Sequence, residues 1–150
     1  MRSVVDLNIQ GPRDPIAALF ADPMNNPTWM DDIDRCEPIS GAPGFPGSTY
    51  RMVPKSGSRV FVATVLSTDL PTEVRLQLDA SDMTVLITDR FSALSEDATR
   101  LVSEEEFRFK SALGRLLGFL AQPLIRRAHR RHMVSFKRFA EDRARNGIVP

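Results

Sequence analysis

The sequence contains one cysteine, one tryptophan, one tyrosine and two histidines among its 150 residues. Cys36 has no partner, which excludes an internal disulfide and a metal site built from several thiolates. No apolar run is long enough to span a bilayer as a helix. The first residues lack the apolar core of a secretory signal, because residues 3–10 alternate between apolar and polar side chains. These absences predict a cytoplasmic protein with one domain, residues 1–150.

Charge is distributed unevenly along the chain, although the formal net charge is only +1. From Arg108 onward there are 11 basic and two acidic residues, which leaves nine basic and 17 acidic residues before it. We predict that this basic segment is the solvated back of a helix, partly neutralised by the acidic body. The run 126–131 lacks the interleaved aromatic residues of a single-strand nucleic-acid platform, so no nucleic-acid partner is expected. A peripheral contact with an anionic membrane is the alternative.

Short alternating segments separated by turn residues predict a sheet of seven strands. The segments cover residues 3–10, 33–39, 48–55, 58–68, 73–80, 83–93 and 99–109. The later connections are too short for parallel crossovers, so these strands should be antiparallel neighbours. After the first strand, Asp14-Pro15 predicts a short helix with Asp14 as its N-cap, and residues 24–28 predict one more turn.

The last third of the chain has the apolar spacing of a long amphipathic helix, Ser111 to Asn146, with leucines at 113, 116, 117, 120 and 124. Pro123 removes one backbone hydrogen bond and clashes with the preceding turn, so we expect a kink or two helices, near 112–121 and 124–145. A helical wheel restarted at Leu124 gathers Ile125, Ala128, His132, Ser135, Phe136 and Phe139 on one face. A curved sheet beside this helix predicts an α+β fold with a site between the two.

Several local phrases carry a resemblance to a known superfamily. They are Asp14-Pro15, residues 19–23 before Trp29-Met30, then residues 47–51, 88–91, 99–101 and 104–109, the last before the Arg-rich helix. In this order they resemble the SRPBCC superfamily, also described as START-like or polyketide cyclase/dehydrase-like. The resemblance implies a helix-grip fold: a curved antiparallel sheet of about seven strands wrapped around a long C-terminal helix, with two short helices after the first strand. It also implies a deep cavity for an apolar ligand, and no single catalytic motif.

Glu105 is a candidate for acid–base chemistry. Strand alternation places it on the same face as Leu101 and Phe107, toward the helix. A carboxylate there needs a raised pKa or a polar partner such as Asp89 or Arg90 on the neighbouring strand. The alternative is a bulge in the strand that turns Glu105 outward into a surface salt bridge.

His132 is the first candidate and Glu105 the second, because His132 lies within the apolar stripe and its pKa range suits proton transfer. The alternative is a histidine that is hydrogen-bonded in the core or at the cavity rim. His129 lies at the edge of the stripe and is expected to be solvated. No third ligand accompanies the two histidines, so no metal site is predicted.

The expected ligand-binding residues combine an apolar wall with two polar groups. The wall consists of Trp29, Tyr50, Leu76, Phe91, Phe107, Leu117 and Phe136, and Glu105 and His132 orient the ligand. The main hypothesis is a protein, monomeric or homodimeric, that binds a small, largely apolar ligand such as a lipid, polyketide or aromatic metabolite without a cofactor. The alternative is an enzyme of the polyketide cyclase or dehydratase type that uses His132 or Glu105 as acid or base.

Overall fold

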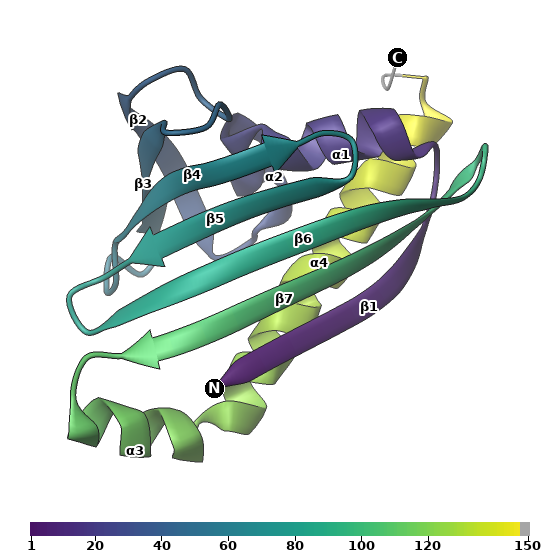
Figure 1. Ribbon diagram of the computed structural model, residues 1–150. Helices are drawn as coiled ribbons and strands as arrows, with labels where there is room; N and C mark the ends of the chain where they lie inside the picture. The colour runs from purple at the N-terminus through teal and green to yellow at the C-terminus, as the bar shows by residue number, and fades with distance from the viewer. Residues whose placement is uncertain (148–150) are drawn as a thin grey trace.

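Seven antiparallel strands form one curved sheet in the computed structural model, which describes residues 1–147 (Figure 1). The strands are β1 (Arg2–Gln10), β2 (Ile33–Ser40), β3 (Thr49–Pro54), β4 (Phe61–Asp69), β5 (Glu73–Asp79), β6 (Met83–Ser95) and β7 (Ala98–Phe109). Their order is β1-β7-β6-β5-β4-β3-β2, so β2 to β7 are consecutive hairpins and β1 pairs with the last strand. All seven predicted segments are strands, with ends shifted by at most three residues.

The helices are α1 (Arg13–Ala21), a short 3-10 turn η1 (Pro23–Asn25), α2 (Asn26–Trp29), α3 (Ala112–Leu120) and α4 (Gln122–Arg145). The prediction that Asp14 caps α1 is wrong, because the helix already begins at Arg13 and Pro12 is the cap residue. Asp and Pro are tolerated throughout the first turn, where backbone N–H groups have no helical partner, so the pattern does not single out the cap. Asp22 caps η1 and accepts a hydrogen bond from the Met24 backbone N–H at 3.0 Å.

Pro123 divides the C-terminal segment into two helices, as one of the two predicted alternatives required. The proline lies in the first turn of α4, where its missing N–H costs no hydrogen bond. Ser111 begins α3 by accepting a hydrogen bond from the Gly114 N–H at 2.9 Å. In Figure 1, α4 crosses the sheet diagonally and α3 lies at an angle to it, beyond the end of β7.

An aromatic cluster holds α4 against one end of the sheet. The Phe136 ring meets Phe20 of α1 and Trp29 of α2, with ring centroids 4.9 Å and 5.3 Å apart. Phe91 of β6 joins the cluster through Phe20. A separate apolar cluster covers β3 to β6 and includes Tyr50, Met52, Val65, Leu78 and Val85. The helix therefore covers one end of the concave face and leaves room over the other.

The leucines of α3 and of the start of α4 do not pack against the sheet, although the sequence pattern places them in an amphipathic helix beside it. They are 55% to 67% exposed. The break at Pro123 gives α3 and α4 different directions, so the two segments do not share one buried face. Among residues 1–147, no helix is both long and apolar enough to cross a membrane.

Replacing Phe136 by alanine should destabilise the protein by roughly 3–5 kcal/mol, because it leaves a cavity at the centre of the aromatic cluster. The change is measured by urea unfolding followed through the fluorescence of Trp29, the only tryptophan. Phe45→Ala is the matched control, since Phe45 is an exposed loop residue and its loss should change stability little. A loss below about 1 kcal/mol for Phe136→Ala would contradict the packing described above.

Candidate ligand-binding cavity

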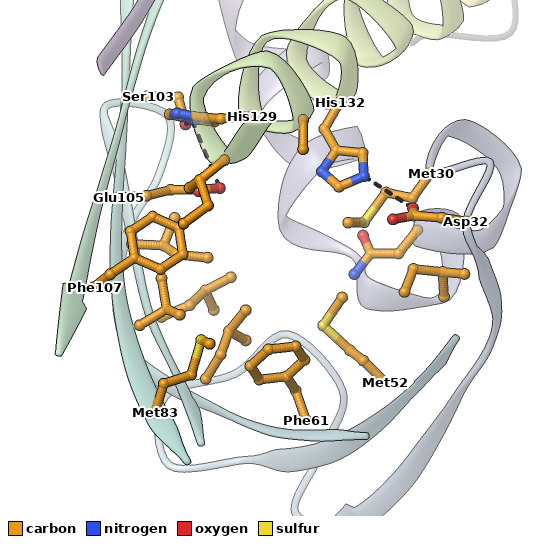
Figure 2. A pocket seen from close by; sticks show the side chains of 18 of the residues that line it. Met30, Asp32, Met52, Phe61, Met83, Ser103, Glu105, Phe107, His129 and His132 are labelled. Carbon is orange, nitrogen blue, oxygen red and sulfur yellow. Dashed lines mark hydrogen bonds and ion pairs between the residues drawn. The ribbon is translucent and has the colours of Figure 1, made fainter. Parts of the chain in front are cut away.

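A cavity of about 540 Å³ lies between the concave face of the sheet, α2, α3 and the start of α4. Figure 2 shows side chains arranged around this open space, with strands on two sides and α4 above. Every second residue of β6 and β7 points into it: Val85, Ile87 and Asp89 from β6, and Ser103, Glu105 and Phe107 from β7. The volume and the mostly apolar wall are those of a small-molecule site.

Seven of the nine predicted ligand-binding residues line this cavity: Trp29, Tyr50, Leu76, Glu105, Phe107, Leu117 and His132. Phe91 and Phe136 do not, because both are fully buried in the aromatic cluster under α1. Phe91 shares the inward face of β6 with Asp89, but α1 closes over the strand at Phe91. Strand alternation predicts which face a residue occupies, and it does not predict which part of that face another element covers.

Glu105 faces the cavity, as strand alternation predicted. It lies opposite Ile87 on β6, in a stretch of β6–β7 pairing with no register shift, so the alternative of a bulge is wrong. Its carboxylate lies 3.7 Å from Nε2 of His129 (Figure 2). Burial, and then the charge of Asp89, raise the pKa of Glu105 from 4.5 to about 8. A large fraction of Glu105 is therefore a neutral carboxylic acid at neutral pH, able to donate a hydrogen bond.

Asp89 lines the cavity with Glu105 and acts on it as a nearby charge, whereas Arg90 does not line the cavity. Asp89 is fully buried, and neither of its carboxylate oxygens has a hydrogen-bond partner among residues 1–147. Burial raises its pKa to about 7, against the opposing effect of the Ser103 hydroxyl across the β6–β7 pair. Arg90 points to the outer face, where its Nε donates to Glu73 at 3.0 Å. The two cavity carboxyls thus have no basic partner beside them on the sheet.

His129 is buried, which contradicts the prediction that it is solvated. It is 1% exposed, and its ring nitrogens lie 2.8 Å from the Ser3 hydroxyl and 2.9 Å from the Ser103 hydroxyl. Burial, and then the charge of His132, lower its pKa to about 4, so the ring is neutral at neutral pH. The helical wheel placed His129 at the edge of the stripe, but β1 packs against that edge. The sequence did contain a signal for a buried histidine: Ser3 and Ser103 are polar residues on the inward faces of two otherwise apolar strands.

His132 lies at the rim of the cavity, with Nε2 2.9 Å from an Asp32 carboxylate oxygen (Figure 2). This hydrogen bond is the main cause of the lowered pKa of Asp32. Asp31, Asp32 and His132 have the ligand types of a metal site. However, the Arg131 guanidinium lies 3.7 Å from Asp31 and 3.8 Å from Asp32, so an ion-pair network accounts for this cluster without a metal. His132 does not join the inner group of Glu105 and Asp89.

Further polar atoms come from α2 and the neighbouring strands β2 and β3. The Trp29 indole N–H has no acceptor among the described residues, although Trp29 lines the cavity. Burial raises the pKa of the nearby Tyr50 phenol well above its ordinary value, so it stays a hydrogen-bond donor. Burial also raises the pKa of Cys36 to about 11, which leaves an unreactive thiol. Sequence reasoning included Trp29 and Tyr50 only as apolar wall and did not consider the indole N–H and phenol groups that they bring to the cavity.

No family model and no curated protein matches the sequence. Solved structures do match the fold. A START superfamily protein from Mycobacterium smegmatis is 14% identical over 97% of each chain, with a TM-score of 0.72. The Zhui aromatase/cyclase from Streptomyces sp. R1128 is 13% identical, with a TM-score of 0.76 over 95% of this chain and 94% of that one. Major latex-like protein 151 from Panax ginseng is 12% identical, with a TM-score of 0.74 over 96% and 97%.

These similarities confirm the predicted SRPBCC/START-like, helix-grip fold. The chain has its elements in the expected order: a strand, short helices, six strands and a long C-terminal helix. The identities are low, so the likeness concerns the fold, and the chemistry of the cavity has to be argued from the residues described above.

Glu105 should make the protein less stable as the pH rises. Its folded-state pKa of about 8 lies above the ordinary 4.5, so between these values the folded protein holds more protons than the unfolded chain. The free energy of unfolding therefore falls with rising pH in this window. Glu105→Gln removes that contribution, so the stability of the variant relative to the wild type should rise progressively with pH, by on the order of 4 kcal/mol near pH 8.

The measurement is urea unfolding at several pH values from about 5 to about 8. The lowered pKa of His129 changes the free energy of unfolding in the opposite direction. The stability that the neutral ring contributes is lost as the pH falls from 6.5 toward about 4. His129 is present in both proteins, so the comparison largely cancels it. Glu106→Gln is the matched control, because Glu106 is the next residue and pairs with Arg108 on the outside. Parallel pH curves for wild type and Glu105→Gln would contradict the buried carboxyl.

Proposed function

We propose that this protein binds a small, largely apolar molecule, such as a lipid, polyketide or aromatic metabolite, in the cavity between the sheet and the C-terminal helices. The observation that carries the proposal is an apolar cavity with two buried carboxyl groups that have no lysine or arginine beside them among the described residues, only the neutral ring of His129. Aliphatic and thioether side chains such as Leu76, Ile87 and Met83 supply an adaptable wall. We expect the protein to act in the cytoplasm, where the free Cys36 thiol stays reduced.

The polar end of the cavity favours a ligand with neutral oxygen functions over a carboxylate. Protonated Glu105 and Asp89 donate hydrogen bonds to a carbonyl or hydroxyl oxygen, as do Trp29 and Tyr50. Of the residues that line the cavity, Arg59 is the only one with a permanent positive charge, and it already pairs with Asp82 at 2.7 Å. A ligand carboxylate in the deep part would therefore lie beside two acids without a cation, which is costly.

The names of the similar structures support an enzymatic function of this fold in one case and leave the function open in the other. One is called an aromatase/cyclase and another a START superfamily protein. For this chain, the apolar wall and the polar end described above favour binding as the first candidate.

A second candidate function is ring closure of a polyketide. The specific observation in its favour is the 3.7 Å separation between the Glu105 carboxyl and the neutral His129 ring inside the cavity. Such closure needs a base that removes a proton next to a carbonyl and an acid that protonates the attacked carbonyl oxygen. Neutral Glu105 fits the acid that protonates the carbonyl oxygen, the neighbouring His129 ring fits the base that receives the proton, and the cavity would hold the chain folded. His132 fits less well, because its imidazole is engaged with Asp32 at the rim.

The binding proposal predicts that 1-dodecanol displaces a neutral apolar dye, Nile red, from the cavity at about tenfold lower concentration than dodecanoate at neutral pH. The two probes share a chain length and differ in the charge of the polar end. Leu76→Trp should abolish dye binding by filling the cavity, while Leu66→Trp, on the exposed side of β4, should leave it unchanged. Equal displacement by both probes would contradict the selectivity, and no dye binding at all would contradict the cavity as a site.

The cyclase candidate predicts that Glu105→Gln slows cyclisation of a poly-β-keto model substrate by about 10²–10⁴-fold while dye displacement by that substrate is largely kept. His132→Ala should change the rate by less than about tenfold, because His132 lies at the rim. Product formation is followed by the absorbance of the new aromatic ring. Wild-type protein that binds the substrate without converting it would exclude this candidate and leave the binding function.

A further inference from the structure

Exposed apolar side chains of the described residues gather on α3 and the start of α4. Six of the fifteen exposed large apolar side chains belong to α3 and the start of α4, and we call them the α3 surface: Leu113, Leu116, Leu117, Phe119, Leu120 and Leu124. Single exposed leucines are ordinary on a soluble protein, but a contiguous apolar surface of this kind marks an interaction site.

Two glycines explain why α3 turns its bulky side chains outward. Gly114 and Gly118, one turn apart, face the Phe109 ring at the end of β7. A Cβ atom at Gly118 would lie 2.4 Å from that ring, so only glycine permits this close approach. The small face of α3 therefore contacts the protein, and the leucines are left on the remaining faces. The exposure follows from how α3 is attached to β7.

The α3 surface adjoins arginines that have no acidic partner. Arg115 within α3, and Arg126, Arg127 and Arg130 in the first turns of α4, form no ion pair with any residue from 1 to 147. The sequence has no acidic residue from 107 to 140. Arg127 follows Leu124 by three positions, so the two side chains are neighbours on the helix surface. Exposed apolar and unpaired cationic groups are thus next to each other.

A shallow groove between β1 and α4 adds to this positive region. It is lined by Arg2, Arg126 and Arg130 together with residues 3–5. Guanidinium groups in this arrangement suit phosphate oxygens, which they bind through two parallel hydrogen bonds. The α3 surface and this groove are therefore suited to a partner that offers phosphate groups next to an apolar region.

We propose that the α3 surface docks on an anionic phospholipid bilayer, with the leucines and Phe119 in the interfacial region and the four arginines among the phosphates. A short amphipathic helix with this composition lies in the plane of the interface. A second copy of the chain fits less well, because a two-fold symmetric contact would bring the unpaired arginines of both copies together. The bilayer supplies the apolar phase and the opposite charge at once.

Docking would bring the membrane next to the cavity. Gly114, Leu117 and Gly118 of α3 line the cavity, as do Ala121 and Ile125 just beyond it. The same helix therefore forms a wall of the cavity and presents the α3 surface. An apolar ligand dissolved in the bilayer would reach the cavity past one helix. This last step rests on the proposed binding function, whereas docking itself does not.

The test is co-sedimentation of the full chain with vesicles of phosphatidylcholine, with and without phosphatidylglycerol. We expect binding to the anionic vesicles about tenfold tighter than to the neutral ones, and weaker binding at high salt. The double variant Leu116→Ser/Leu120→Ser should lose about tenfold in affinity. Its fold is checked by circular dichroism and should be intact, since both side chains are exposed. Arg115→Gln/Arg127→Gln should reduce the salt dependence.

Leu94→Ser is the matched control, because Leu94 is also an exposed leucine but lies near the end of β6, at the opposite end of the sheet from α3 (Figure 1). It should bind vesicles as the wild type does. Equal binding to neutral and anionic vesicles, or unchanged binding of the double variant, overturns the proposal. So does a wild-type dimer in light scattering that becomes monomeric in the double variant while vesicles are not bound, since a second copy then occupies the surface.

The same proteins separate this proposal from the binding function. Nile red displacement by 1-dodecanol in the absence of vesicles should be unchanged in the double variant, because its substitutions are outside the deep cavity. Vesicle binding without any dye binding would leave docking in place and remove the cavity function. Dye binding without vesicle binding would leave the cavity function in place and remove the docking proposal.

Discussion

The packing of Phe136 between Phe20 and Trp29 determines where the C-terminal helix lies, and the cavity depends on that position. The sheet curves around a space wider than one helix, so α4 can be packed closely at only one end of it. Aromatic rings from α1, α2 and β6 fill that end completely. At the other end the strands carry aliphatic, Met and Phe side chains that the aromatic cluster does not cover, and the space beside them stays open. Close packing in one half of the groove therefore creates the site in the other half.

The carboxyl groups in the cavity are costly for folding, and this cost is informative. Apolar side chains at Asp89 and Glu105 would continue the pattern of their strands and would be easier to bury. Instead both acids are held where their pKa values rise toward neutrality, without a cation beside them on the sheet. Strongly shifted groups of this kind, gathered in a cavity, are typical of functional sites. The neutral His129, held by two serines, forms part of the same inner group and brings no charge to it.

Sequence reasoning succeeded where the structure is local. Alternation located the seven strands and the inward direction of Glu105, because the side-chain period of a strand does not depend on its surroundings. It failed where a second element decides the outcome. Phe91 has the correct face but lies under α1, and His129 lies at the edge of the helical stripe but is covered by β1. The leucines of α3 were assigned to a packed helix, because the wheel cannot include the change of direction at Pro123 or the contact of Gly118 with Phe109.

The basic residues of the C-terminal segment do not all have the same surroundings. The prediction that the whole segment is a solvated, partly neutralised helix face therefore fits only one part of it. Toward its C-terminal end, Lys137 pairs with Glu141 and Arg145 with Asp142, and Arg131 reaches the acidic residues before β2. That part agrees with a solvated helix whose charge is partly neutralised. Among residues 1–147, Arg138 and Arg143 in that part also form no ion pair, but it is Arg115, Arg126, Arg127 and Arg130 that lie nearest to the exposed leucines. The first part of the segment differs from the rest in the exposed leucines beside its unpaired arginines, and a surface that meets both apolar and anionic groups requires the two kinds of side chain in the same place.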